Sequence, residues 1–184
     1  MAPIKRSAFS TDAMARMALC AALIAVCAWL SIPAVVPFTL QTFGVFCTAG
    51  FLGGRRGTLA VAVYLLLGLT GLPVFAGFSA GAGALFGASG GYLLGFLLLP
   101  PAYALVTGRL GTGPSAMTLG MLAGLLAVYA AGTLWFMAVY TRTTGPVALT
   151  TVLGWCVLPF ILPDLAKMAA AILLVRRLAR YVRR

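Results

Sequence analysis

The chain ends in the stretch LPFILPDLAKMAAAILLVRRLARYVRR, residues 158–184, and this stretch decides the class of fold. It is an apolar run of about the length that crosses a bilayer, and a cluster of arginines follows it. Inside the run stand Asp164 and Lys167, an acid and a base three residues apart. Ionisable side chains at membrane depth are rare and usually face a cavity or a partner. The stretch therefore predicts a membrane helix with an unusual polar feature inside it.

The rest of the chain has the same apolar character. Of its 184 residues, 62% are hydrophobic and 8% are charged, whereas soluble domains carry roughly 25% charged residues. Six apolar segments are separated by Gly, Pro and polar residues, which favour turns; they cover residues 12–32, 41–54, 57–72, 82–107, 115–139 and 148–178. We therefore expect an all-α integral membrane protein with six transmembrane helices, in which residues 1–184 form a single membrane domain. Asp12 is expected to cap the first helix.

The distribution of basic residues predicts the orientation in the membrane. If the six spans alternate from a cytoplasmic N-terminus, the outer side receives only Arg142, which is a strong positive-inside bias. The inner side receives Lys5, Arg6, Arg16, Arg55, Arg56, Arg109, Arg176, Arg177, Arg180, Arg183 and Arg184. Both termini are therefore expected in the cytoplasm. Because the net charge of +11 follows the helix ends, we expect contact with anionic membrane lipids and not with nucleic acid.

The pair Asp164 and Lys167 lies on one face of a helix, because the two residues are three apart. Two interpretations of the pair remain open. In the first, the two charges neutralise each other and only fix the packing of the helix. In the second, they are a polar anchor for an anionic or amide-bearing ligand. The two roles are compatible, and the spacing does not choose between them.

Two outer loops contain the other candidate residues of a binding site. They are SIPAVVPFTLQT, residues 31–42, and GLPVFAGFSAGAGALFGASGG, residues 71–91. Irregular backbone at membrane depth is tolerated where protein or a cavity surrounds it, so we expect both loops to fold over the outer half of the bundle. Aromatic walls with a few polar groups are typical of a small-molecule site. Such groups are Phe38, Gln41, Thr42, Phe75, Ser79, Ser89 and Tyr92.

Glycines at a spacing of four residues predict close packing between helices. Gly87, Gly91 and Gly95 show this spacing in the fourth segment. They do not form a dinucleotide-binding fingerprint, because the third glycine of that motif and a preceding strand are both missing.

Small residues at the same spacing also occur in the first segment, as the pair Ala18 and Ala22 and the pair Ala21 and Ala25. The spacing leaves open whether they pack within the chain or dock another membrane subunit.

The composition excludes several kinds of chemistry. The chain has no histidine, and Asp12 and Asp164 are its only carboxylates, so an acid–base pair or a metal site is nearly unavailable. Neither lysine follows a glycine, so a phosphate-binding loop is missing. The four cysteines lack C-x-x-C spacing and are expected to be packing residues. An intramembrane enzyme would depend on Ser79 or Ser89 with Lys167; we expect no catalytic residue, no metal and no cofactor.

Three stretches, in order along the chain, resemble one family. VPFTLQT (residues 36–42), GLPVFAGFSAGAGALFGASGGYLLGF (71–96) and LPFILPDLAKMAAA (158–171) together resemble BioY, the biotin-specific substrate-binding (S) component of energy-coupling factor (ECF) transporters. The resemblance covers nearly the whole chain. It implies a subunit of the prokaryotic cytoplasmic membrane that captures biotin outside the cell and delivers it inward. A transmembrane coupling (T) subunit and ATPase subunits would supply the energy, so ATP would be used by other chains.

The resemblance also implies roles for particular residues. Asp164 and Lys167 match the D-x-x-K of the family and are expected to line the biotin pocket. Tyr92 lies in the matching GGY, and Gln41 and Thr42 lie in the matching loop. Lys167 is expected either to complement the carboxylate of biotin or to hold Asp164 ionised for the ureido N–H groups. Which end of biotin faces which residue stays open.

Two further features are read in the light of the same resemblance. Phe38 and Phe75 are expected to cover the rings of biotin, while Ser79 and Ser89 are expected to meet its polar edges. Ala88 and Ser89 depart from the Pro-Thr more often found in the family, which keeps a hydroxyl and removes a proline from the turn. Ala18 and Ala22 fall where S components commonly dock on the coupling subunit. An S component for another small vitamin is the alternative.

Overall fold

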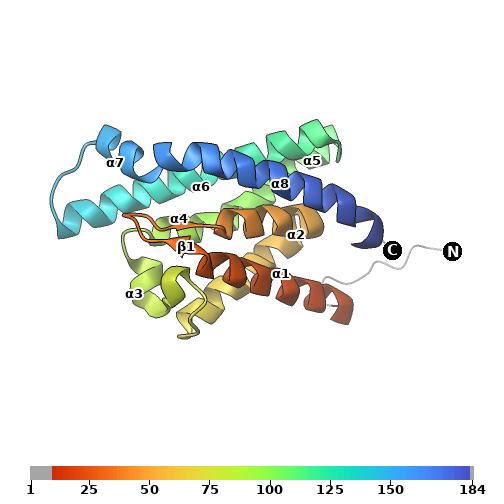
Figure 1. Ribbon diagram of the computed structural model, residues 1–184, viewed down its shortest axis with the longest axis horizontal. Helices are drawn as coiled ribbons and strands as arrows, with labels where there is room; N and C mark the ends of the chain where they lie inside the picture. The colour runs from red at the N-terminus through yellow and green to blue at the C-terminus, as the bar shows by residue number, and fades with distance from the viewer. Residues whose placement is uncertain (1–9, 183–184) are drawn as a thin grey trace.

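The computed structural model describes residues 10–182, with side chains as far as Leu178, so the basic residues Lys5, Arg6, Arg183 and Arg184 and the side chain of Arg180 lie outside the described part. The described chain is almost entirely helical (Figure 1). Its longer helices are α1 (Thr11–Trp29), α2 (Gln41–Leu69), α5 (Leu99–Leu110), α6 (Pro114–Thr143) and α8 (Leu158–Val182). Its short elements are β1 (Ser31–Ile32), β2 (Phe38–Thr39), η1 (Ala76–Phe78), α3 (Gly81–Phe86), α4 (Gly90–Gly95), η2 (Phe96–Leu98) and α7 (Leu149–Cys156).

Five helices in the described part are long and apolar enough to cross a membrane. They cover Thr11–Trp29, Gln41–Leu69, Gly90–Leu110, Pro114–Thr143 and Leu158–Leu178. The chain is thus a multi-pass membrane protein. The count differs from the expected six because the two predicted segments, residues 41–54 and 57–72, are counted together as α2, which has a non-helical break at Gly53.

Helix α2 reverses its direction at Gly53, inside the turn that the sequence predicts there. Gly53 has φ 72° and ψ −160°, a backbone conformation that is essentially restricted to glycine. A Cβ atom on Gly57 would lie 3.6 Å from the carbonyl oxygen of Thr48, although nine residues of straight helix span about 13 Å. The side chains of Gln41 and Tyr64 are hydrogen-bonded across the two arms. Residues 41–52 and 54–69 therefore lie side by side, as the orange and yellow parts of α2 do in Figure 1.

Two other predicted helices are interrupted. The segment expected at residues 82–107 is divided into α3, α4, η2 and α5, with Gly87 in extended conformation between the first two. The segment expected at 148–178 breaks at Val157, where the backbone leaves the helical region between α7 and α8. The first loop contains the antiparallel hairpin β1–β2, which hydropathy did not indicate.

The interrupted elements gather at one end of the bundle. The β1–β2 hairpin, α3 and α7 lie at this end, whereas the start of α1 and the C-terminal part of α8 lie at the other (Figure 1). The outer loops predicted to contain the binding residues thus lie together, far from the first and last described helical turns.

Glycines allow the helices of the bundle to approach closely. A Cβ atom on Gly91 would overlap the side chain of Trp135, and one on Gly95 would lie 3.3 Å from the backbone of Val128. The predicted close packing is therefore confirmed for these two glycines, which face α6. Gly87 instead lies in the turn between α3 and α4, where its Cβ would meet the backbone of Gly83.

The small residues of α1 are divided between two faces. Ala21 and Ala25 are buried and pack within the chain, whereas Ala18 and Ala22 are exposed on the outside of the helix. The prediction that Asp12 caps this helix is wrong. Ser10 is the cap, because its hydroxyl oxygen accepts a hydrogen bond from the amide of Ala13. Asp12 lies in the first turn of the helix and forms an exposed ion pair with Arg16.

Candidate functional site

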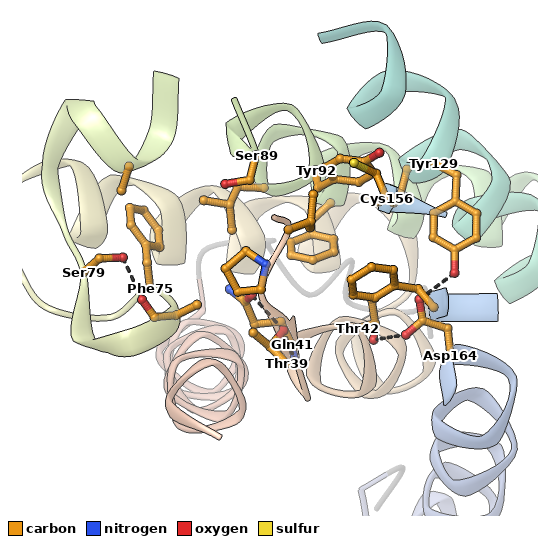
Figure 2. A pocket seen from close by; sticks show the side chains of 18 of the residues that line it. Thr39, Gln41, Thr42, Phe75, Ser79, Ser89, Tyr92, Tyr129, Cys156 and Asp164 are labelled. Carbon is orange, nitrogen blue, oxygen red and sulfur yellow. Dashed lines mark hydrogen bonds between the residues drawn. The ribbon is translucent and has the colours of Figure 1, made fainter. Parts of the chain in front are cut away.

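Residues of the two predicted binding loops and of helices α2, α3, α4, α6, α7 and α8 line a cavity of about 390 Å³. This volume lies in the range of small-molecule sites, roughly 300–1,000 Å³. Eight of the nine predicted binding residues line it, namely Gln41, Thr42, Phe75, Ser79, Ser89, Tyr92, Asp164 and Lys167. Figure 2 shows Ser79 and Phe75 at one end of the cavity and Asp164 at the other. Residues from loops and helices far apart in the sequence therefore surround one space, although their role in binding stays a prediction.

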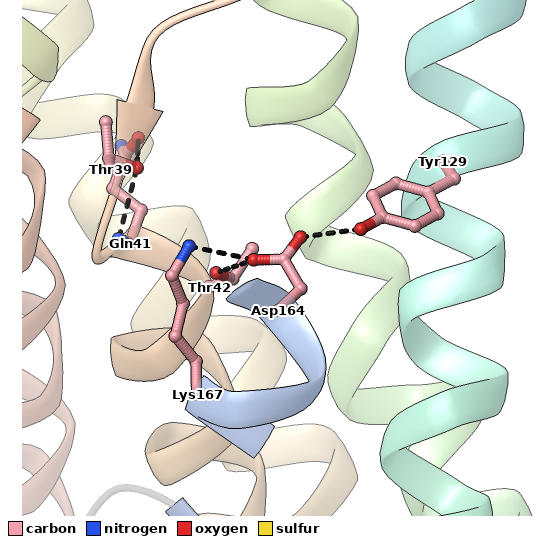
Figure 3. A network of polar contacts seen from close by, with 6 residues as sticks. All are labelled: Thr39, Gln41, Thr42, Tyr129, Asp164 and Lys167. Atoms are coloured by element: carbon pink, nitrogen blue, oxygen red, sulfur yellow. Dashed lines mark hydrogen bonds and ion pairs between the residues drawn. The ribbon is translucent and has the colours of Figure 1, made fainter. Parts of the chain in front are cut away.

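The polar end of the cavity is centred on the carboxylate of Asp164 (Figure 3). Asp164 and Lys167 are only 2% and 7% exposed, and the ammonium of Lys167 lies 2.8 Å from Oδ1 of Asp164. The hydroxyl of Thr42 in α2 donates to the same oxygen at 2.8 Å. The hydroxyl of Tyr129 in α6 donates to Oδ2 at 2.7 Å. Donors from three helices thus converge on one buried carboxylate.

Helix α8 directs its polar residues into the cavity by its spacing. Phe160, Asp164 and Lys167 follow one another at four and three residues and therefore share one face of the helix. Pro163, immediately before Asp164, has no backbone N–H and so leaves one carbonyl of the preceding turn without its helical donor. Among the residues that line the cavity, only Asp164 and Lys167 are charged. The formal charge of the cavity lining is therefore zero.

Phe38, the ninth predicted residue, does not line the cavity but supports its polar end. The ammonium of Lys167 lies 4.5 Å from the centre of the Phe38 ring, a cation–π contact. The same ring stacks on Phe160 with 5.7 Å between the ring centres. Phe38 therefore holds Lys167 and Phe160 at the polar end, and its expected role in covering a ligand stays a prediction.

A second polar network holds the hairpin onto α2. The side-chain oxygen of Gln41 accepts a hydrogen bond from the hydroxyl of Thr39 at 3.0 Å. Its amide nitrogen donates to the hydroxyl of Tyr64 in the other arm of α2. Because Gln41 is buried and both its polar ends are partnered, its cavity-facing position is fixed by the protein itself.

Two aromatic walls of the cavity rest on glycines. A Cβ atom on Gly68 would overlap the ring of Phe75, and one on Gly132 would overlap the ring of Tyr92. The hydroxyl of Tyr92 also lies 3.2 Å from that of Thr133 in α6. Each ring therefore occupies space that any larger residue in the neighbouring helix would take.

The end of α1 and the start of the hairpin are joined to the loop that carries Phe75 and Ser79. The indole N–H of Trp29 donates to the carbonyl oxygen of Pro73 at 2.8 Å, and its ring stacks on Phe78 with 5.4 Å between centres. The hydroxyl oxygen of Ser31 accepts a hydrogen bond from the amide of Gly77. Phe78 has φ 58° and is the only non-glycine residue with positive φ in residues 10–182. These contacts connect the hairpin region to the loop that carries Ser79.

The main residue that the sequence reasoning missed is Tyr129, which lines the cavity and contacts Asp164. A signal for it existed, because Tyr129 is the only polar side chain between Leu119 and Gly132 of a membrane helix. Trp135, Tyr140 and Trp155 are other aromatic residues of this region and do not line the cavity. Of these, Tyr140 and Trp155 contact each other edge to face.

The described residues offer little for metal or acid–base chemistry. Residues 10–182 contain no group of three or more His, Cys, Asp or Glu residues placed to hold a metal ion. The four cysteines are buried free thiols, in agreement with a packing role. The hydroxyl of Ser79 donates to the carbonyl oxygen of Ala76, whereas Lys167 is paired with Asp164. The arrangement is suited to holding a small molecule by hydrogen bonds and apolar contact.

Comparisons with known proteins agree with this geometry. A model of the BioY family matches residues 4–184. The chain is 41% identical over 160 residues to the biotin transporter BioY of Thermotoga maritima, covering 86% of this chain and 90% of that protein. It is 39% identical over 163 residues to the probable biotin transporter BioY of Pyrococcus horikoshii, covering 88% and 93%.

One solved structure has the same fold. It is the S-component for biotin from an ECF-type ABC transporter, with a TM-score of 0.79 and 29% sequence identity. The likeness covers 91% of this chain and 90% of that chain. The similarity of fold therefore extends over most of the chain.

Proposed function

The chain belongs to the BioY family, and we propose that it is the biotin-binding S component of an ECF transporter, which captures biotin outside the cell and delivers it inward. The observation that carries the proposal is the buried pair of Asp164 and Lys167 at the polar end of a largely apolar cavity of about 390 Å³. Relatives over most of the chain are named biotin transporters. The chain acts in transport and not as an enzyme.

The chemistry of biotin suits the two ends of the cavity. Its ureido ring is neutral and carries both hydrogen-bond donors and an acceptor, which matches a site whose two charges cancel. Its apolar thioether ring suits the walls formed by Phe75, Tyr92 and Phe160. The carboxylate of biotin would find no unpaired cation at the polar end, because Lys167 is already paired with Asp164. We place it towards Ser79, at the end of the cavity farthest from Asp164 in Figure 2.

The fold supports a six-pass topology in the cytoplasmic membrane of a prokaryote. If each arm of α2 is one pass, residues 10–182 cross six times, and the first and last helical turns lie on the same side. We assign that side to the cytoplasm, because Arg55, Arg56, Arg109 and Arg176 belong to it by position in the chain, whereas Arg142 belongs to the opposite end. These arginines are expected to contact anionic lipid headgroups. Residues 1–184 then form one membrane domain.

Energy for transport would come from other chains. The exposed face of α1 around Ala18 and Ala22 allows the backbone of a partner helix to approach closely, and we assign it to the transmembrane coupling subunit. ATP is consumed by separate ATPase subunits. Biotin is the transported ligand, and no cofactor is required.

Calorimetric titration of the detergent-solubilised chain with biotin tests the proposal. We expect one biotin bound per chain and no displacement by riboflavin or thiamine. Asp164→Asn is expected to weaken binding at least about tenfold, because a charge-assisted hydrogen-bond centre is lost.

The chain provides a matched control for this experiment. Asp12 is its only other carboxylate, lies in the exposed first turn of α1 and is far from the cavity in sequence and structure. Asp12→Asn is expected to bind biotin as the wild type does. Absence of biotin binding by the folded wild-type chain, or displacement of biotin by another vitamin at equal concentration, would contradict the proposal.

A further inference from the structure

Tyr129 lines the cavity, and its hydroxyl group donates a hydrogen bond to Asp164. We propose that the hydroxyl oxygen of Tyr129 accepts a hydrogen bond from a ureido N–H of the ligand and so selects a donor at this end of the cavity. The inference rests on the proposed function, since it names a contact within the biotin site. It assigns to Tyr129 a role in specificity, beyond the support of Asp164.

The proton of the Tyr129 hydroxyl is already committed to the protein. A tyrosine hydroxyl has one proton to donate and lone pairs that accept. Its proton points to Oδ2 of Asp164 at 2.7 Å, and an ionised carboxylate has no proton to return. Tyr129 is half-buried and lines the cavity. A ligand that meets this oxygen therefore meets an acceptor and not a donor.

The surroundings of Asp164 strengthen this polarity. Oδ1 of Asp164 already receives hydrogen bonds from Lys167 and Thr42, each at 2.8 Å. These contacts hold the carboxylate in place. If the hydroxyl of Tyr129 turned to a different partner, Oδ2 of Asp164 would lose its hydrogen bond. Donation to a buried carboxylate is a charge-assisted hydrogen bond, and it polarises the donor oxygen so that this oxygen becomes a better acceptor.

A cyclic urea satisfies the polar end in one arrangement. Its carbonyl oxygen needs a donor, and the ammonium of Lys167 has protons beyond the one directed to Asp164. Its two N–H groups need acceptors, and the oxygens of Tyr129 and Thr42 provide them from two different helices. If the carboxylate of biotin lay in the same place, its oxygens, which only accept hydrogen bonds, would face the oxygens of Tyr129 and Thr42, whose protons are already donated to Asp164. Tyr129 therefore favours the ureido end of biotin and rejects its carboxylate end.

A double-mutant cycle, in which one change is made in the protein and the other in the ligand, tests the contact. Wild-type chain and Tyr129→Phe are each titrated with biotin and with two analogues, each methylated on one ureido nitrogen. Methylation of the nitrogen that faces Tyr129 is expected to weaken wild-type binding at least about tenfold more than it weakens binding to Tyr129→Phe, because the variant has no acceptor to lose. Equal methylation penalties in both proteins, for both analogues, would overturn the proposal.

Controls separate this contact from a purely structural role. Tyr140→Phe makes the same change in the same helix at a residue that does not line the cavity, and it should leave all three affinities unchanged. A folded Tyr129→Phe chain with no biotin-induced rise in melting temperature at millimolar biotin also overturns the proposal, because one neutral hydrogen bond does not account for so large a loss.

A second variant covers the case in which Tyr129→Phe does not fold. Tyr129→Trp keeps an N–H for Asp164 and offers no acceptor, so the same loss of the methylation penalty is expected, and its persistence would overturn the proposal. Failure of the wild-type chain to bind biotin at all would instead contradict the proposed function, so the two failures are distinguishable.

Discussion

The ammonium of Lys167 lies 2.8 Å from Oδ1 of Asp164 within one turn of α8, and both side chains are almost fully buried. The cost of burying two charges is offset only while they remain paired and hydrogen-bonded. Here Thr42 and Tyr129 complete the hydrogen bonding of the carboxylate. The pair is therefore at once a structural element of the bundle and the polar surface of the cavity, so stability and binding depend on the same atoms.

The first prediction separates these two roles. Lys167→Met leaves a buried carboxylate without its counter-charge and should lower the free energy of unfolding by about 3–5 kcal/mol. Adding Asp164→Asn removes the remaining charge and should restore most of that stability, but not biotin binding. Unfolding in mixed detergent micelles and calorimetric titration measure the two effects. A double variant as unstable as Lys167→Met would contradict this account, and Asp12→Asn, in an exposed pair, should cost less than about 1 kcal/mol.

The second prediction concerns the glycine beneath Tyr92. Gly132→Ala places a Cβ atom where the ring of Tyr92 lies, so the ring must shift towards the cavity. Overpacking of this kind costs about 1–3 kcal/mol, and biotin affinity should fall about tenfold or more. Gly154→Ala is the control, because no atom lies within 4 Å of the added Cβ there. Unchanged affinity in Gly132→Ala would show that the Tyr92 wall does not shape the site.

The third prediction concerns the reversal of α2. Gly53→Ala forces an L-residue into φ 72° and ψ −160°, which costs on the order of 1–3 kcal/mol of stability. Gly108→Ala in α5 has open space around the new Cβ and no positive φ, so it should be neutral or slightly stabilising. Thermal unfolding of both variants in detergent makes the comparison. Equal melting temperatures would mean that the turn tolerates side chains.

The fourth prediction concerns the contacts between Trp29 and the loop that carries the lining residues Phe75 and Ser79. Trp29→Phe keeps a ring against Phe78 but removes the donor to Pro73. Loss of one hydrogen bond of about 1 kcal/mol should raise the dissociation rate of biotin roughly fivefold, with little change in the association rate. Stopped-flow displacement with labelled biotin measures both rates. Trp155→Phe, which changes an exposed residue outside the cavity, should leave them unaltered; a similar effect there would assign the change to general loosening.

By itself the sequence determined the membrane class, the α-helical fold and eight of the 20 residues that line the cavity. These properties are local, because hydropathy over about 20 residues decides whether a helix suits a bilayer, and a spacing of three residues places Asp164 and Lys167 on one face. The turn chemistry around Gly53 was also readable, since the predicted break and the reversal coincide. The two segments expected on either side of this break correspond to the two arms of α2, which meet at Gly53.

Only the tertiary structure decided which polar groups meet. Tyr129 lies 35 residues from Asp164 and Thr42 lies 122 residues away, yet both donate to its carboxylate. Phe38 contacts the ammonium of Lys167 from a residue 129 positions away in the sequence, a contact that no spacing indicated. Such contacts depend on how helices rotate and pack against one another, and glycines such as Gly132 set that packing by their close approach. A periodicity along one helix contains no information about the rotation of its neighbour, which is why the polar end of the cavity appears only in three dimensions.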